Sequence, residues 1–325
     1  MKKKILLSAL SFLLLSGCVG VHVSLLSETE PLEEKVLEGK GTPKLLLLDL
    51  SGVITFREEK EGLLVKRPSK VAFFREALHK AEGDGDVVGV IVRINSPGGS
   101  VAASDTIYHE IMNFKQKKKV PVYAYIMELG ASGGYYVAAA ADRIIASPSA
   151  IVGSIGVVAM KFNIEGLLSK IGVVDETYKS GPKKDFWSPF RPSTAEEKAM
   201  LQDIIDKLYA RFVEVVYVNR QNSLSKQQVT ALADGRILTA GDALEARLID
   251  QTAYLDETIA SMRKEVSVDQ GRIITYDRPN TFKANIYSEY EDMTSTGQQV
   301  INLISIDAEA LLLFPRVQFM YIWNP

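Results

Sequence analysis

The stretch "VPVYAYIMELGASGGYYVAAAA", residues 120–141, contains a complete strand–turn–helix unit. Its first part is apolar and rich in β-branched and aromatic residues, which predicts a buried strand. The small residues that follow permit a tight turn, and a helix is expected directly after it. One serine, Ser132, lies in this turn, and a strand-to-helix corner is where nucleophilic serines are commonly displayed. The stretch therefore predicts an α/β unit and makes Ser132 a candidate nucleophile.

The same alternation precedes this stretch. Residues 44–54, "KLLLLDLSGVI", and residues 86–94, "DVVGVIVRI", are apolar runs that predict buried strands. Helical spacing follows each of them, over residues 68–82 and through residues 105–114. Strand, turn and helix thus occur three times by residue 141, which predicts an α/β domain with mostly parallel strands.

The C-terminal half contains fewer clear signals. Ser193 and Thr194, followed by acidic residues, predict the start of a long amphipathic helix that ends near Arg220. No internal repeat is found, and the chain from about Val266 onward is less regular. We expect that this last segment packs on the core or on a neighbouring subunit.

Composition narrows the class of protein. The chain has 325 residues, with 38 Lys and Arg against 40 Asp and Glu, so no basic excess favours nucleic acid. The N-terminus resembles the signal peptide and lipobox of bacterial lipoproteins, in which the cysteine carries lipid. It consists of Lys2–Lys4, a short apolar run and Cys18. We expect four regions: signal peptide 1–17, membrane tether 18–43, α/β domain 44–265 and C-terminal extension 266–325.

The partner of Ser132 is sought by elimination. The histidines, His22, His79 and His109, all precede Ser132, which excludes the Ser–acid–His order of α/β-hydrolases. Cys18 belongs to the export signal, and no metal-binding motif is present, so no metal or cofactor is expected. A triad in another order and a site with paired carboxylates both stay open.

Lysine is a further candidate for the base. A lysine amine deprotonates serine only in its neutral form, which burial in an apolar pocket favours. The loop "KSGPKKDFWSP" contains Lys179, Lys183 and Lys184 beside Phe186 and Trp187. A solvated basic loop is the alternative reading of this segment.

Four stretches together resemble one family. They are "RINSPGGSV", "ASGGYYVAAAADRIIASPSAIVGSIGV", "YKSGPKKDFWSPFRPSTAEE" and "ADGRILTAGDALEARLID". In order and spacing they are similar to the short bacterial form of signal peptide peptidase A, peptidase family S49. The resemblance implies the ClpP/crotonase-like fold and a serine protease with a Ser–Lys dyad.

The resemblance also implies the site residues. Ser132 would be the nucleophile and Lys184 the general base, with Lys183 as the adjacent alternative. Ser154 would hydrogen-bond the catalytic lysine. Backbone N–H groups of Gly99, with Gly98 as its alternate, and of Gly133 would form the oxyanion hole. Glu128 departs from the small residues or methionine common in the family, and it could alter substrate preference.

The family further implies substrates and assembly. Its substrates are remnant signal peptides and some misfolded exported proteins, and members of this length form octamers that share active sites between subunits. Lipidated Cys18 would hold such an enzyme on a membrane of the cell envelope. Two rivals remain: a crotonase-type acyl-thioester enzyme, and an inactive lipoprotein scaffold with the same fold.

Overall fold

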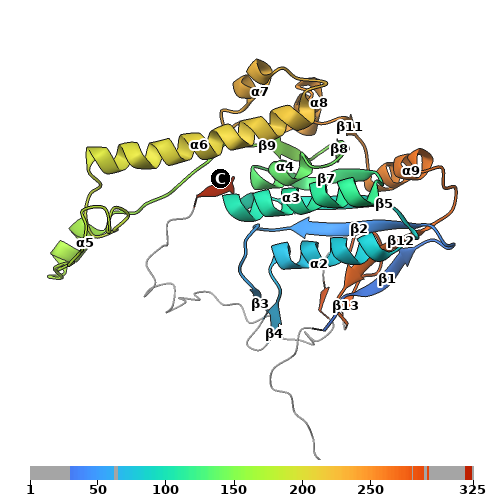
Figure 1. Ribbon diagram of the computed structural model, residues 1–325, viewed down its shortest axis with the longest axis horizontal. Helices are drawn as coiled ribbons and strands as arrows, with labels where there is room; N and C mark the ends of the chain where they lie inside the picture. Colours follow the sequence, from blue (N-terminus) through green and yellow to red (C-terminus); the bar gives the residue numbers. More distant parts are fainter. Residues whose placement is uncertain (1–29, 62–64, 280, 289–290, 293–318, 324–325) are drawn as a thin grey trace, which may run out of the picture. The chain divides into compact units, whose positions relative to one another are not determined.

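The computed structural model describes residues 30–61, 65–279, 281–288, 291–292 and 319–323 (Figure 1). Contacts divide the chain into two units, of which the smaller is Met1–Thr29 with Glu59–Arg67. In that unit β3 (Glu59–Glu61) and β4 (Val65–Arg67) form an antiparallel hairpin. Cys18 and the predicted signal lie outside the described residues, as does the first part of the predicted tether. In the described part of the chain, no helix is long and apolar enough to cross a membrane.

The larger unit is built on one sheet. Its strands run in the order β1-β12-β2-β5-β7-β8-β11, and β9 pairs with the end of β7 and with β10. All of these pairs are parallel except β1 with β12 and β9 with β10. The strands are β1 (Glu33–Glu38), β2 (Lys44–Ser51), β5 (Val87–Ser96), β7 (Val122–Ala131), β8 (Arg143–Ala146), β9 (Ile151–Gly153), β10 (Ile237–Thr239), β11 (Gln251–Thr252) and β12 (Arg272–Asp277). The predicted α/β fold with mostly parallel strands is confirmed.

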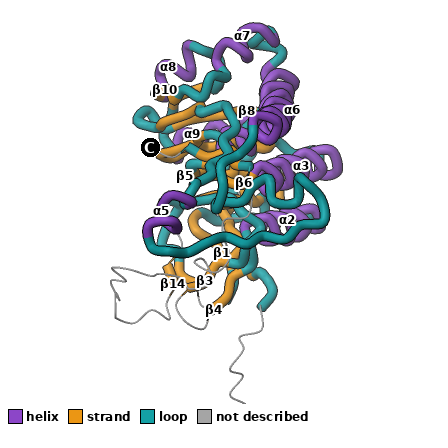
Figure 2. Tube along the Cα trace, turned by 90° about the vertical axis from the view of Figure 1, so that its left-hand side faces the viewer, coloured by secondary structure: helices purple, strands orange, loops and turns teal. Residues whose placement is uncertain are grey.

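Helices cover both faces of the sheet. They are α2 (Lys70–Gly83), α3 (Val101–Lys118), α4 (Gly133–Ala138), α5 (Glu165–Lys170), α6 (Ala195–Arg220), α7 (Lys226–Leu232), α8 (Ala240–Glu245) and α9 (Leu255–Glu265). Figure 2 shows α2, α3 and α6 stacked on one side of the strands. The short strands β6 (Gly98–Ser100), β13 (Thr281–Phe282), β14 (Glu291–Asp292) and β15 (Met320–Ile322) lie outside the main sheet.

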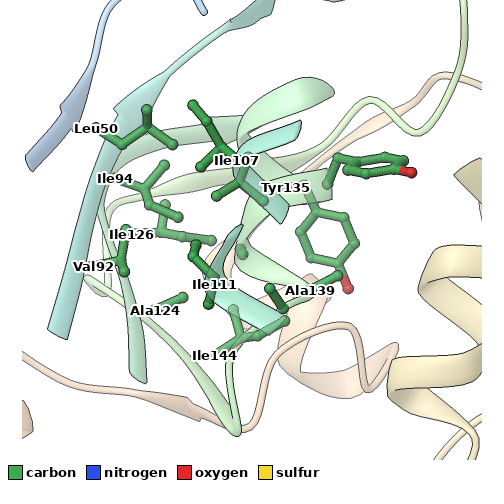
Figure 3. Packing of buried hydrophobic residues seen from close by; sticks show 14 of the residues in the cluster. Leu50, Val92, Ile94, Ile107, Ile111, Ala124, Ile126, Tyr135, Ala139 and Ile144 are labelled. Atoms are coloured by element: carbon green, nitrogen blue, oxygen red, sulfur yellow. The ribbon is translucent and has the colours of Figure 1, made fainter. Parts of the chain in front are cut away.

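The apolar runs are buried on both faces, as a central parallel strand requires. In β2, Leu46 and Leu48 face the larger core with α2 and α3, whereas Leu45 and Leu47 face the smaller core with α9. Figure 3 shows the larger core, where strand residues such as Ile94 pack against residues of α3 and α4. This core holds the end of β7 and the start of α4 in place, which is where Ser132 lies.

The helix starts follow their capping residues. The Ser69 side chain accepts a hydrogen bond from the N–H of Ala72 at the start of α2. Thr194 and Glu197 form a reciprocal capping box at the start of α6, at the predicted position.

Three segments differ from what the sequence predicts. Residues 163–172 have amphipathic spacing but form only the short helix α5, which has no buried residue. Within the predicted tether, β1 (Glu33–Glu38) pairs in antiparallel with β12, and beyond residue 265, β12 pairs in parallel with β2. The main sheet therefore includes one strand from the expected tether and one from the expected extension. Residues 319–323 pack on the core through Tyr321.

Candidate active site

Ser132 lies at a strained corner between β7 and α4. Its φ is 53° and its ψ is −115°, an unusual backbone conformation for a residue with a side chain. Its N–H donates to the carbonyl of Gly153 at 2.7 Å, and its own carbonyl accepts from the N–H of Tyr136 at 2.9 Å. Such strain costs roughly 1–3 kcal/mol and persists only where the surroundings impose it. The Ser132 side chain does not cap α4, so its hydroxyl is not committed to the helix.

Ser154 lies beside this corner because of strand register. Ala131 at the end of β7 pairs with Gly153 at the end of β9, so the next residue of each strand is a serine. Ser154 also has a positive φ, 51°, and its N–H donates to the carbonyl of Arg236 at 2.6 Å. Only 1% of Ser132 and 7% of Ser154 is exposed. The structure therefore brings the two predicted serines together.

The glycines of "SPGG" contact the same corner. Gly98 has a φ of 99°, and a Cβ on it would lie 2.6 Å from the backbone nitrogen of Gly133. A Cβ on Gly99 would lie 2.1 Å from the carbonyl oxygen of Ile54. These close approaches require glycine and place the backbone of residues 98–99 against the residue after Ser132.

The outer edge of β6 is occupied by β15. Tyr321 lies opposite Gly99 in this antiparallel pair, and the N–H of Trp323 donates to the carbonyl of Pro97 at 2.8 Å. On its other side, Met320 exchanges two backbone hydrogen bonds of 3.0 Å with Val158. An extended segment of this chain thus lies between two backbone segments beside Ser132.

Aromatic side chains anchor β15. The Tyr321 ring stacks on Tyr136 at 5.1 Å between centroids and lies 4.6 Å from Phe212 of α6. Its hydroxyl donates to the carbonyl of Leu208 at 2.8 Å. Burial raises the pKa of the Tyr321 phenol, so it stays a neutral donor. No periodic pattern in residues 319–323 predicted this contact, because it joins segments far apart in the sequence.

Lys184 lies in an exposed turn, and its backbone N–H donates to the carbonyl of Gly181 at 3.1 Å. Its neighbours have acidic partners: Lys179 binds Asp185 at 2.8 Å, and Lys183 pairs with Glu196. Among the described residues, no hydrogen bond or ion pair involves the Lys184 Nζ. Of the three lysines in the loop, Lys184 is therefore the one whose amine is not paired with a carboxylate.

The loop of Lys184 and the corner at Ser132 are connected to different parts of α6. Asp185, next to Lys184, is tied through Arg191 to Glu197 in the first turn of α6. By contrast, α4 contacts α6 through Tyr136 and Phe212, and Tyr321 of β15 contacts the carbonyl of Leu208. Since a helix rises about 1.5 Å per residue, these contact points lie about 16–23 Å apart along α6. Figure 1 shows the same arrangement, with α5 beyond the N-terminal end of α6 and α4 beneath its C-terminal half.

A cavity of about 300 Å³ opens beside Ser154. Its lining residues come from the segment after β9, from α6, from the loop before β10 and from β15: Ser154, Gly156, Val157, Val158, Tyr209, Ala233, Asp234, Gly235 and Ile322. The Asp234 carboxylate is paired with Arg236 at 2.6 Å, which lowers its pKa to about 2. The cavity has room for a further side chain beside Ser154.

The other sequence candidates lie away from this arrangement. His79 and His109 are exposed on α2 and α3, where helices were predicted. Glu128 is exposed on β7. Within the described ranges, no group of three or more His, Cys, Asp or Glu side chains is placed to hold a metal ion.

Comparison with known proteins finds similarity to one family of peptidases. Residues 114–269 match the model of peptidase family S49. A protein of Enterococcus faecium, "Putative signal peptide peptidase SppA", is 34% identical over 87% of this chain and 83% of that protein. "Putative protease MJ0651" of Methanocaldococcus jannaschii is 31% identical over 96% of this chain and 100% of that protein.

Two further similarities are more limited. "Serine protease SPPA, chloroplastic" of Arabidopsis thaliana is 33% identical over 61% of this chain but only 29% of that protein. The solved structure of a mutant of the 1510-N membrane-bound stomatin-specific protease covers 68% of this chain and 85% of that chain. Its TM-score is 0.43 and its sequence identity 17%.

Proposed function

Because the chain belongs to peptidase family S49 and is a serine peptidase, we propose that Ser132 is its nucleophile and that Lys184 of a neighbouring subunit is its base. One observation carries this proposal: Ser132 occupies a strained strand-to-helix corner, beside Ser154 and against a glycine pair. A crotonase-type enzyme or a scaffold has no need for a serine in this backbone conformation.

The reaction follows from these groups. The neutral Lys184 amine takes the proton of the Ser132 hydroxyl while the oxygen attacks the peptide carbonyl. As the tetrahedral intermediate collapses, the C–N bond breaks and the lysine ammonium returns the proton to the leaving amine. Lys184, neutral again, then accepts a proton from water as the water oxygen attacks the acyl-enzyme. When the bond between the acyl carbon and the Ser132 oxygen breaks, the lysine ammonium returns this proton to Ser132, and both groups regain their starting forms.

Backbone N–H groups stabilise the oxyanion. Gly133 supplies one donor directly after the nucleophile. For the second donor we keep Gly99, as the family resemblance implies, because the N–H of Gly98 already donates to the Ser96 hydroxyl at 3.1 Å. The close approach of Gly98 to the nitrogen of Gly133 places the backbone of this glycine pair beside Ser132.

Substrate binds as an extended strand along β6. The position of β15 supports this mode, since it already places a backbone between β6 and Val158 beside Ser132. Main-chain hydrogen bonds then provide affinity for many sequences, and apolar pockets select among them. Membrane-derived signal peptides, which are apolar, are the proposed substrates.

Assembly completes the site. The separation along α6 favours a lysine from a second copy, and the cavity beside Ser154 is where it would enter. A homo-oligomer, with octamers as the family resemblance implies, therefore shares active sites between subunits. Lipidation of Cys18 and export to the cell envelope would hold this assembly next to its substrates.

A serine-directed fluorophosphonate probe tests the proposal. Wild-type enzyme should be labelled, and both Ser132→Ala and Lys184→Ala should lose labelling, whereas Lys183→Ala should keep it. Labelling that survives Ser132→Ala would disprove the nucleophile. Labelling that is lost in Lys183→Ala but kept in Lys184→Ala would transfer the base to Lys183.

Co-expression of two inactive variants tests the shared site. In a ring whose sites combine Ser132 of one subunit with Lys184 of the next, a random equal mixture of Ser132→Ala and Lys184→Ala subunits restores about a quarter of the sites. No recovery in mixed oligomers would mean that both groups come from one chain.

A further inference from the structure

A network of charged groups joins the loop of Lys184 to the start of α6. Arg191 binds both oxygens of the Asp185 carboxylate, at 2.8 Å through Nε and 2.9 Å through Nη2. The same guanidinium binds Glu197, at 2.9 Å through Nη1 and 2.6 Å through Nη2. Further hydrogen bonds reach the carbonyls of Asp185 and Pro192. One planar cation thus connects the residue after Lys184 to α6.

The end of the network at α6 is buried and hydrogen-bonded. Glu197 is 3% exposed, and its carboxylate also accepts from the N–H of Thr194 at 2.8 Å. A second contact holds the residues just before α6. The amine of Lys161, in the segment that follows β9, donates to the Ser193 hydroxyl at 2.8 Å. The network is therefore fixed at two points outside the loop.

We infer that Arg191 is a positioning residue, which sets the place of the Lys184 amine for the serine of the neighbouring subunit. This inference rests on the proposed function. A guanidinium fork binds two carboxylates in fixed directions, whereas a lysine ammonium binds as a point charge on a flexible stem. Arg191 thereby holds the Lys184–Asp185 peptide at one distance from α6, which in turn packs on the nucleophile corner through Phe212.

Charge balance gives Arg191 a second effect. A carboxylate beside a catalytic lysine favours the ammonium form, which cannot act as base. The Asp185 carboxylate lies next in sequence to Lys184, but two cations, Arg191 and Lys179, bind it and hold its pKa well below the usual range. Arg191 and Lys179 therefore compensate the negative charge of Asp185, so that this charge does not favour the ammonium form of Lys184.

The network stays charged across the working range. Hydrogen bonds from Arg191 and from the N–H of Thr194 lower the pKa of Glu197 to about 2. The network therefore stays intact between pH 9 and pH 5. A change of activity with pH in this range does not come from its dissociation.

The test compares Arg191→Lys with Glu196→Gln in the full-length, assembled enzyme. Glu196 is the neighbour of Glu197, but it is exposed and pairs with Lys183, so it serves as the matched control. We expect Arg191→Lys to lower kcat by about 10²-fold, the loss typical of a catalytic group displaced by about 1 Å. KM should change little. The pH at which kcat/KM reaches half its plateau should move upward, because Asp185 loses part of its compensation.

A purely structural role would give another result. If Arg191→Lys only reduced the amount of folded or assembled enzyme, kcat per labelled Ser132 and the pH profile would match those of Glu196→Gln, and the inference would be wrong. If Arg191→Lys does not assemble, Asp185→Asn and Glu197→Gln decide. Both should lower kcat if the network positions the loop, and kcat equal to that of Glu196→Gln in both would overturn the inference.

The Lys184→Ala variant separates this inference from the proposed function. If Lys184→Ala keeps its fluorophosphonate labelling and its kcat, the Ser–Lys assignment fails, whatever the Arg191 variant does. If Lys184→Ala is inactive while Arg191→Lys behaves as wild type at every pH, only the role of Arg191 is disproved.

Discussion

Replacing Tyr321 by alanine tests whether β15 occupies the edge that substrate uses. The side chain is fully buried and contacts Tyr136, Phe212 and the carbonyl of Leu208. Truncation of a buried aromatic side chain to alanine typically costs about 3–5 kcal/mol. Because β15 is short and its main anchor is this ring, most of that cost should fall on the docking of β15.

The expected effect on kinetics follows from competition. A factor of ten in an equilibrium constant corresponds to about 1.4 kcal/mol, so docking of β15 weakens by about 10²–10³-fold. If an extended peptide competes with β15 for β6, the apparent KM falls by up to the same factor, until docking is negligible. The value of kcat changes much less, because the base and the oxyanion donors are kept.

Steady-state hydrolysis of an extended apolar peptide measures both constants, and a thermal melt reports stability. Tyr287→Ala is the control, because Tyr287 is a half-exposed tyrosine outside this aromatic contact. A Tyr321→Ala enzyme with a lowered melting temperature but an unchanged or higher KM would refute the reasoning. Substrate would then bind elsewhere, and β15 would be a structural strand only.

Three further outcomes follow from the structure. Gly98→Ala should abolish fluorophosphonate labelling, since its Cβ would lie 2.6 Å from the nitrogen of Gly133, whereas Gly89→Ala meets the flexible Met262 side chain and should keep labelling. Arg220→Ala removes an ion pair in which Nη1 contacts both oxygens of Asp250, and urea titration should show a loss of about 3–5 kcal/mol in unfolding free energy. Glu197, whose pKa is lowered from 4.5 to about 2, stabilises the fold fully above the unfolded value and loses this contribution as pH falls through about 2. The stability difference between wild type and Glu197→Gln should therefore be constant from pH 9 to pH 5 and shrink in acid; a difference that grows in acid would contradict the network.

Local patterns predicted the strand–turn–helix corner at Ser132 well. The apolar run before Ser132, the glycines after it and the end of β9 all lie within residues 122–154, and the parallel pairing of β7 with β9 brings Ser154 alongside. The capping box at Thr194 is equally local, and the start of α6 was predicted from it.

Sequence patterns did not predict the contacts between segments that are far apart in the chain. The pairing of β12 with β2 joins residues more than 200 positions apart, and a short strand such as β15 has too few residues for a periodic signal. Arg191 was not singled out either, because a charged residue beside a proline reads as an ordinary exposed loop. In the proposed assembly Lys184 reaches Ser132 from a second chain, and no pattern within one sequence could predict such a contact.

The pairing of Ala131 with Gly153 also limits how this protein can change in length. Side chains alternate between the two faces of a strand, so one residue inserted within β7 or β9 would turn its serine toward the opposite face. An insertion in the turn at residues 147–149, between β8 and β9, leaves both strand ends in register. We expect natural and engineered length variation to be tolerated in that turn and excluded from the last residues of either strand.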